Sequence, residues 1–309
     1  MEKYQRILAV IDAAHDDQKA LKRAIELAHK TDASITAFLT IYDFSYEMTT
    51  MLSIDEREAM RTSVINDRLQ WLTEQVNTIS HHGLNIDCKV VWHNRPFEQI
   101  IEQVLTNNYD IVIKGTHQHD KLKSVIFTPT DWHILRKCPC PVLLVKDHSW
   151  PKGGHIIASL NIGSEDKEHK SLNYKITEEA INLSSLIDAN VHLVNSFSCT
   201  PLNIAIEIPE FNVQEYNDSM LNHREKAMQC HAEYFKINKE NTHIKEGLPE
   251  DIIEELSLAL DAELVILGTI GRTGLSAALI GNTAEHVIDK LNCDLLALKP
   301  DGYISPLAK

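Results

Sequence analysis

The segment Tyr109-Asp-Ile-Val-Ile-Lys-Gly-Thr116 occurs a second time, with few changes, as Ala262-Glu-Leu-Val-Ile-Leu-Gly-Thr269. Each copy is a continuous apolar run that ends in Gly-Thr, and the two glycines are 153 residues apart (268 − 115). A continuous apolar run of this length is typical of a parallel strand that is covered on both faces. The repeat therefore predicts two copies of one α/β domain.

Other landmarks follow the same repeat in the same order. Pro96 and Pro249 are also 153 residues apart (249 − 96), and each opens a helical stretch, where proline suits the first turn. The first strands of the two halves differ by 149 residues (161 − 12). The matched segments are 6–12 with 155–161, 96–100 with 249–253, and 142–145 with 295–298.

Each half alternates five short apolar strands with four helices, including helices near 16–31 and 172–188 and an amphipathic stretch at 68–76. This order predicts two tandem, doubly wound parallel-sheet domains of the Rossmann-like α/β class, packed as a pseudo-dimer. We expect residues 1–148 to form the first domain and 154–309 the second. In such sheets, ligands bind outside the carboxyl ends of the strands, where the strand order reverses.

The charge of the chain excludes several functions. It carries 44 Asp and Glu against 30 Lys and Arg, a net charge of -14, which disfavours direct binding of nucleic acid. No run approaches the roughly 20 apolar residues that span a membrane. The first residues lead into an apolar strand without a signal peptide's hydrophobic region. We therefore expect a cytoplasmic protein with no membrane insertion.

The second half contains the clearest chemical motif, Gly268-Thr-Ile-Gly-Arg-Thr-Gly274, followed by Gly281-Asn282-Thr283 at the start of a predicted helix. Glycines let backbone N–H groups approach an anion closely, and a helix start favours negative charge. The segment follows a strand and precedes a helix, as a phosphate-binding loop requires. It predicts a polyphosphate site.

The spacing of Gly, two residues, Gly, nine residues, Gly resembles the ATP-binding signature of the universal stress protein family, and the resemblance covers essentially the whole chain as two consecutive domains. It implies a stress-response sensor or regulator with ATP or a related nucleotide as ligand. ATP-binding members have Asp at the position of Asn161 and Ser or Thr at that of Asn282, so the resemblance implies a nucleotide rather than ATP alone. The implied nucleotide-binding residues are Ser159, Leu160, Asn161, Gly268, Gly271, Arg272, Gly281, Asn282 and Thr283.

The first half keeps Asp12 but loses the glycines. Gln118, Thr128 and Pro129 occupy the positions of Gly271, Gly281 and Asn282, so side chains obstruct the backbone and one N–H donor is missing. We predict no ordinary ATP site in this half. Its degenerate site comprises Asp12, Gly115, Thr116, Thr128 and Thr130.

A group of histidines is the alternative chemistry of the first half. His117, His119 and His133 lie near expected strand ends and are candidate ligands for a transition metal such as zinc or nickel. With 16 histidines in the chain, exposed loop histidines are the favoured interpretation.

Three alternative functions stay open. No nucleophile and base are paired in the sequence, so any enzymatic activity would be weak ATP hydrolysis. Loops 44–55 and 198–213 are rich in Met and Ile, and as a flap they would admit a lipid-like ligand or another non-ATP metabolite to the first domain. The first half could also be kept only to complete the pseudo-dimer, which predicts a monomer or a weak homodimer.

Overall fold

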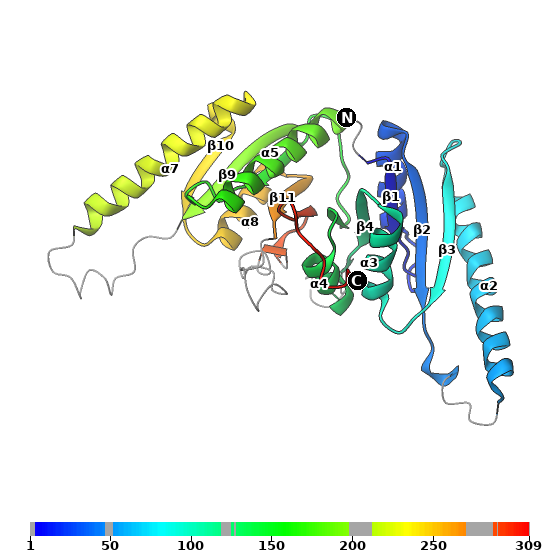
Figure 1. The fold of residues 1–309 in the computed structure, drawn as a ribbon. Coiled ribbons are helices and arrows are strands. Elements are labelled where there is room, and N and C mark those ends of the chain that lie inside the picture. Colours follow the sequence, from blue (N-terminus) through cyan, green and yellow to red (C-terminus); the bar gives the residue numbers. More distant parts are fainter. Residues whose placement is uncertain are drawn as a thin grey trace. The chain divides into compact units, whose positions relative to one another are not determined.

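The computed structural model describes residues 4–46, 52–118, 125–126, 128–197, 212–269, 287–288 and 290–308. Contacts divide the chain into two units (Figure 1). One unit is Met1–Lys146 with Ile304–Lys309, and the other is Asp147–Tyr303. Within the described parts, no helix combines the length and the hydropathy that crossing a membrane requires.

The first unit contains a sheet of neighbouring parallel strands in the order β7-β4-β1-β2-β3. Strand order reverses between β1 and β4, because the chain first adds β2 and β3 on one side of β1 and then β4 and β7 on the other. The elements are β1 (Arg6–Val10), α1 (Lys19–Thr31), β2 (Ser34–Ile41), η1 (Phe44–Tyr46), α2 (Ile54–Thr78), β3 (Ile86–Trp92), α3 (Pro96–Asn107), β4 (Ile111–Gly115), β5 (His117–Gln118), β6 (Val125–Ile126), α4 (Pro129–Lys137) and β7 (Val142–Val145).

The second unit repeats this topology, with parallel strands in the order β12-β11-β8-β9-β10. The reversal point lies between β8 and β11. The elements are β8 (His155–Ser159), α5 (Lys167–Ile187), β9 (Asn190–Phe197), α7 (Val213–Phe235), η2 (Lys239–Asn241), β10 (Thr242–Glu246), α8 (Pro249–Leu260), β11 (Leu264–Gly268) and β12 (Asp294–Leu298).

Equivalent backbone hydrogen bonds occur within each of the two units. The N–H of Ile11 donates to the carbonyl of Phe38 at 2.9 Å, and the N–H of Leu160 donates to that of Val194 at the same distance. These bonds continue the β1–β2 and β8–β9 ladders past the ends of β1 and β8. The predicted fold class, two tandem doubly wound α/β domains, is confirmed.

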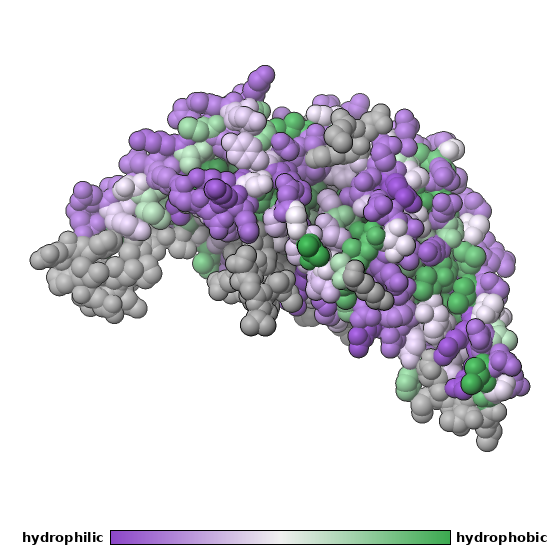
Figure 2. Space-filling model, viewed as in Figure 1, coloured by the Kyte–Doolittle hydropathy of each residue, from purple (hydrophilic) through white to green (hydrophobic). Residues whose placement is uncertain are grey.

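Apolar strands form the core, as their composition predicts. β7 and β12 are buried along their whole length, and the side chains of Ile7, Leu8 and Phe38 have no exposed surface. The helix α7 is different, because only Met228, His231 and Ala232 of its residues are buried. Figure 2 accordingly shows mostly hydrophilic residues over α7.

Helix starts differ from the sequence-based expectation. α1 begins at Lys19 rather than near residue 16, because the Gln18 side chain bonds to the backbone of Asp12 and His15 and holds the preceding residues in a loop. α5 begins at Lys167 rather than near 172, because the Asp166 carboxylate accepts a hydrogen bond from the N–H of Glu168 and caps the helix.

The loops expected to form a flap are only partly described. Residues 47–51 and 198–211, with Met48, Met51 and the isoleucines of the second loop, lie outside the described residues. In the first loop, residues 44–46 form η1, and Ser53 caps α2 through a reciprocal bond with Glu56. Ile54 has 72% of its surface exposed. The flap therefore stays a prediction.

Candidate functional site

A cavity of about 300 Å³ lies at the carboxyl ends of β8, β9 and β11. It sits at the reversal point of strand order between β8 and β11, where crossovers diverge and leave a crevice. Apolar side chains of α5, α8 and β11 contribute to its walls, and amide groups lie among them. Its lining residues are Ser159, Leu160, Asn161, His169, Leu172, Asn173, Ile176, Asn195, Ser196, Pro249, Ile253, Leu267, Gly268 and Val287.

Two amide side chains fix the backbone that follows β8. The N–H of Asn161 donates to Asn173 Oδ1 at 2.9 Å, and Asn173 Nδ2 returns a bond to the Asn161 carbonyl at 3.0 Å. Asn195 Nδ2 donates to the Leu160 carbonyl at 2.9 Å. Asn173 and Asn195 are buried, whereas Asn161 is exposed. The backbone at Asn161 is therefore fixed at the cavity, and its exposed side-chain amide lies 3.4 Å from His169 Nδ1.

Gly268 ends β11 in direct contact with α5. A Cβ atom built on Gly268 would overlap Leu172 Cδ2 and lie 2.9 Å from Leu172 Cγ and 3.3 Å from Ile176 Cδ1. The equivalent Gly115 is far less restricted, since a Cβ there would be 3.8 Å from Lys19 Cβ and 3.9 Å from the backbone nitrogen of Ala20. A side chain at 268 would therefore displace Leu172, whereas one at 115 would meet only ordinary van der Waals contacts.

A cation lies beside the strand ends that form the cavity. The Arg224 guanidinium, on α7, is 5.4 Å from the centre of the Phe197 ring, which directly follows Ser196 of the cavity lining. It also packs on Gly163, where a Cβ would be 2.7 Å from its Nη1 atom. Sequence reasoning missed this residue because nothing in an exposed helix indicates which strand ends it reaches.

The structure brings together four of the predicted nucleotide-binding residues. Ser159, Leu160, Asn161 and Gly268 line the one cavity. The other five predicted residues, Gly271, Arg272, Gly281, Asn282 and Thr283, lie outside the described residues. Asn173 and Asn195 were not predicted, because the buried face of α5 also carries Thr177 and Glu179 and so did not single out Asn173.

The residues of the degenerate first site follow β1, lie at the end of β4 or start α4. Asp12 accepts a hydrogen bond from the N–H of Ala14 at 2.8 Å and lies 3.3 Å from His15 Nδ1. Thr116 is structural, because its N–H and hydroxyl both donate to the Val145 carbonyl, as those of Thr269 do to Leu298. Gly115 ends β4, while Thr128 caps α4 and Thr130 lies in its first turn.

The metal hypothesis gains no support. Among the described residues, no group of three or more His, Cys, Asp or Glu is placed to hold a metal ion. The ring of His133 stacks on Phe97, with centroids 4.0 Å apart. Burial, followed by the positive charges of Lys137 and Arg136, lowers the pKa of His133. His119 and the side chain of His117 lie outside what the structure describes.

Three histidines form a ladder across the second sheet. His155 Nδ1 lies 2.9 Å from His192 Nε2, and His192 Nδ1 lies 3.2 Å from His243 Nε2. They come from β8, β9 and β10, so neighbouring strands place the rings side by side. Burial lowers the pKa of His192 to about 4, and the positive charges of His155 and His243 act in the same direction. The ladder is therefore neutral at its centre at pH 7.

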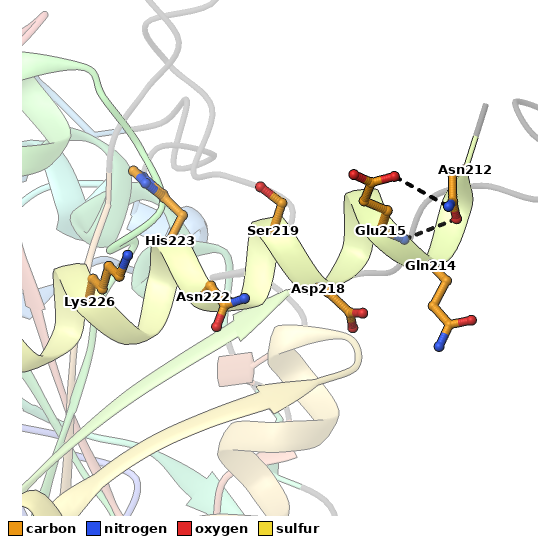
Figure 3. Close-up of a pocket in the computed structure, with 8 residues that line it drawn as sticks. All are labelled: Asn212, Gln214, Glu215, Asp218, Ser219, Asn222, His223 and Lys226. Carbon is orange, nitrogen blue, oxygen red and sulfur yellow. Dashed lines mark hydrogen bonds between the residues drawn. The ribbon is translucent and has the colours of Figure 1, made fainter. Parts of the chain in front are cut away.

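A second hollow, of about 900 Å³, follows the amino-terminal half of α7 (Figure 3). Its described lining consists of polar residues between Asn212 and Lys226, all from this helix and its cap. Side chains from a single helix face cannot surround a ligand, so we assign no site to this hollow.

Comparison with known proteins agrees with the repeat and the fold. The model of the "Universal stress protein family" matches residues 3–146 and again 169–299. The chain belongs to the universal stress protein family. It is 52% identical to Universal stress protein E of Escherichia coli K12 over 308 residues, which cover 99% of this chain and 98% of the relative.

Two solved structures match nearly the whole chain. A putative universal stress protein from Pseudomonas aeruginosa UCBPP-PA14 is 31% identical, with a TM-score of 0.72 and coverage of 96% of this chain and 94% of that one. A functionally unknown protein from Pseudomonas aeruginosa PAO1 is 30% identical, with a TM-score of 0.74 and coverage of 96% and 93%. Universal stress proteins act in the stress response, and this chain is one of them.

Proposed function

We propose that the second domain binds ATP or a related nucleotide in the cavity at the ends of β8 and β11, and that the protein acts as a sensor or regulator in the stress response. The observation that carries this proposal is the position of Gly268. It lines the cavity and is also the first glycine of the phosphate-type motif, so the chain runs directly from the cavity into that motif. A ligand with an apolar ring and a polyphosphate fits both parts.

The chemistry of the lining suits such a ligand. A volume of about 300 Å³ lies at the lower end of the range for small-molecule sites. Leu160, Leu172 and Ile253 offer apolar surface to a base, and the Asn161 amide offers both a donor and an acceptor. Arg224 and the backbone N–H groups of the glycine motif supply positive potential for phosphates.

Catalysis is a minor part of this proposal. Of the described lining residues, His169 is the one titratable side chain, and none is a carboxylate that would activate water. We infer that any ATP hydrolysis is slow and that occupancy of the site is what a partner reads.

Calorimetric titration with ATP tests the proposal through a pair of matched variants. Gly281→Asp places a negative charge in the glycine motif, whereas Thr128→Asp makes the same change at the equivalent position of the first half (281 − 153). Asp at 128 can accept the helix N–H bond that Thr128 accepts, but it removes the hydroxyl that donates to buried Asp131, so the fold of Thr128→Asp is checked by circular dichroism before the titration. We expect one ATP per chain, lost in Gly281→Asp and retained in Thr128→Asp. Binding unaffected by Gly281→Asp would refute the proposed site.

A further inference from the structure

Two buried, oppositely charged residues distinguish the first domain from the second. Lys114 and Asp131 stand 153 residues before Leu267 and Ala284, so both charges of the first half are replaced by apolar residues in the second. Leu267 lines the second domain's cavity. Lys114 therefore occupies a position equivalent to the wall of a ligand site.

The two side chains form an ion pair away from solvent. Lys114 Nζ lies 2.7 Å from Asp131 Oδ1, with 12% of the lysine side chain and 1% of the aspartate side chain exposed. Lys114 Nζ also donates to the Gly115 carbonyl at 3.2 Å. A single charge at this depth would be strongly disfavoured, so each residue requires the other.

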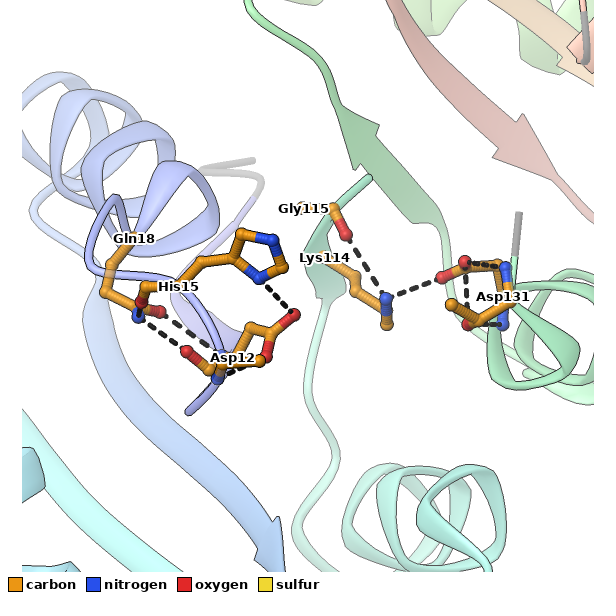
Figure 4. A network of polar contacts seen from close by, with 8 residues as sticks. Asp12, His15, Gln18, Lys114, Gly115 and Asp131 are labelled. Atoms are coloured by element: carbon orange, nitrogen blue, oxygen red, sulfur yellow. Dashed lines mark hydrogen bonds and ion pairs between the residues drawn. The ribbon is translucent and has the colours of Figure 1, made fainter. Parts of the chain in front are cut away.

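The second oxygen of Asp131 is engaged at the start of α4. Asp131 Oδ2 accepts hydrogen bonds from the Thr128 N–H at 2.7 Å and the Thr128 hydroxyl at 2.8 Å. Figure 4 shows the carboxylate between this helix start and the Lys114 ammonium. A helix N–H, a hydroxyl and an ammonium are the groups that bind phosphate oxygens in proteins. Here they all bind the protein's own carboxylate.

The strand end of the first domain that corresponds to Asn161 also makes hydrogen bonds within the protein. Gln18 Nε2 donates to the carbonyls of Asp12 and His15, and Gln18 Oε1 accepts from the Asp12 N–H at 3.2 Å. The Asp12 carboxylate bonds to Ala14 and lies beside His15, as Figure 4 shows. The second domain repeats these backbone bonds through Asn173, and Asn161 Nδ2 lies 3.4 Å from His169 Nδ1. The two domains therefore differ at Lys114 and Asp131 rather than at this strand end.

We propose that the Asp131 carboxylate is a built-in anion that fills the first domain's anion-binding position, with Lys114 and the start of α4 as its binding site. The first domain then needs no anionic ligand at this position and admits none. Removal of the carboxylate should uncover a site for a free anion such as inorganic phosphate. This inference concerns the first domain and does not depend on nucleotide binding by the second.

The test uses three full-length variants, with inorganic phosphate as the probe. Asp131→Ala removes the anion and leaves Lys114, while Lys114→Leu combined with Asp131→Ala reproduces the residues of the second half and removes both charges. Asp131→Asn keeps an acceptor for Thr128 and hence the helix cap, so it serves if Asp131→Ala does not fold. Thermal midpoints and phosphate titrations are compared with those of the unmodified protein, which report any binding by the second domain.

We expect phosphate to raise the thermal midpoints of Asp131→Ala and Asp131→Asn but to leave the double variant at the level of the unmodified protein. The affinity of Asp131→Ala for phosphate should exceed that of the double variant by about tenfold or more, as expected for one charge-assisted contact. Equal phosphate effects in all four proteins would overturn the proposal. So would an Asp131→Asn variant that is as stable as the unmodified protein and insensitive to phosphate.

Discussion

Replacing Gly268 by alanine should cost the second domain both stability and ligand affinity, whereas the same change at Gly115 should cost neither. The added methyl at Gly268 overlaps Leu172 Cδ2 and is 2.9 Å from Leu172 Cγ, closer than carbon atoms pack. Leu172 is buried, but it also borders the cavity, so its side chain has one direction in which to move. The strain is therefore relieved by filling the ligand site.

The size of the effect follows from this geometry. Overpacking a core typically lowers the free energy of unfolding by about 1–3 kcal/mol. Because the Leu172 side chain can move into the cavity, we expect Gly268→Ala to lower it by about 1–2 kcal/mol. A leucine side chain displaced into a cavity of about 300 Å³ removes space that a base would use, so ATP affinity should fall by about tenfold or more. At Gly115 the nearest atoms are 3.8 Å from the added methyl, so the change should stay within about 0.5 kcal/mol.

Hydrogen exchange measured on peptides resolves the two domains, which a whole-chain denaturation curve would not. Gly268→Ala should speed exchange in β8, β11 and α5, while Gly115→Ala should leave β1 and β4 unchanged. Calorimetric titration with ATP gives the affinity of each variant. Equal stability and equal ATP affinity for the two variants would refute the reasoning from close packing.

Three further predictions concern the histidine ladder, the cavity rim and the long helix α2. His192 has a pKa of about 4 when folded and about 6.5 when unfolded, so its contribution to stability is complete above pH 6.5 and is lost as the pH falls towards 4. From pH 6.5 to pH 5 the free energy of unfolding should fall by about 2 kcal/mol, which should appear as a lower urea midpoint. An equal fall in His192→Gln would contradict the assignment of this loss to His192. Arg224→Ala should lower the affinity for ATP about tenfold and leave the affinity for adenosine unchanged, as measured by calorimetry. Equal losses of affinity for both ligands would show that Arg224 does not contact phosphate. Ser53→Ala removes the capping box of α2 and should lower the stability of the helix by about 1 kcal/mol. The loss should appear as faster hydrogen exchange at residues 54–57, and unchanged exchange there would count against the cap.

The strands were predictable because buried parallel strands are continuous apolar runs, as in β7 and β11. Helix starts were not, because they depend on side-chain bonds. The Asp166 cap moves the start of α5 earlier, and the Gln18 bonds to the loop move that of α1 later. A sequence pattern shows which segment is helical but not which side chain satisfies its first N–H groups.

The candidate site was predictable where it consists of strand ends. Ser159, Leu160 and Asn161 end one strand and Gly268 ends its neighbour, and parallel strands bring these ends together. Arg224 comes from an exposed helix far along the chain, so only the tertiary structure brings it to the rim. The Lys114–Asp131 pair was not predicted, although Lys114 interrupts an apolar strand where the second half has Leu267.

Photoaffinity labelling with 8-azido-ATP, followed by peptide mapping, tests the central claim most directly, because the azide reacts with whatever lies beside the base. The account predicts labelled peptides from the second domain that contain residues 159–173 or 264–269, with the label competed away by ATP. Label confined to peptides of the first domain, or label that ATP does not compete, would contradict it.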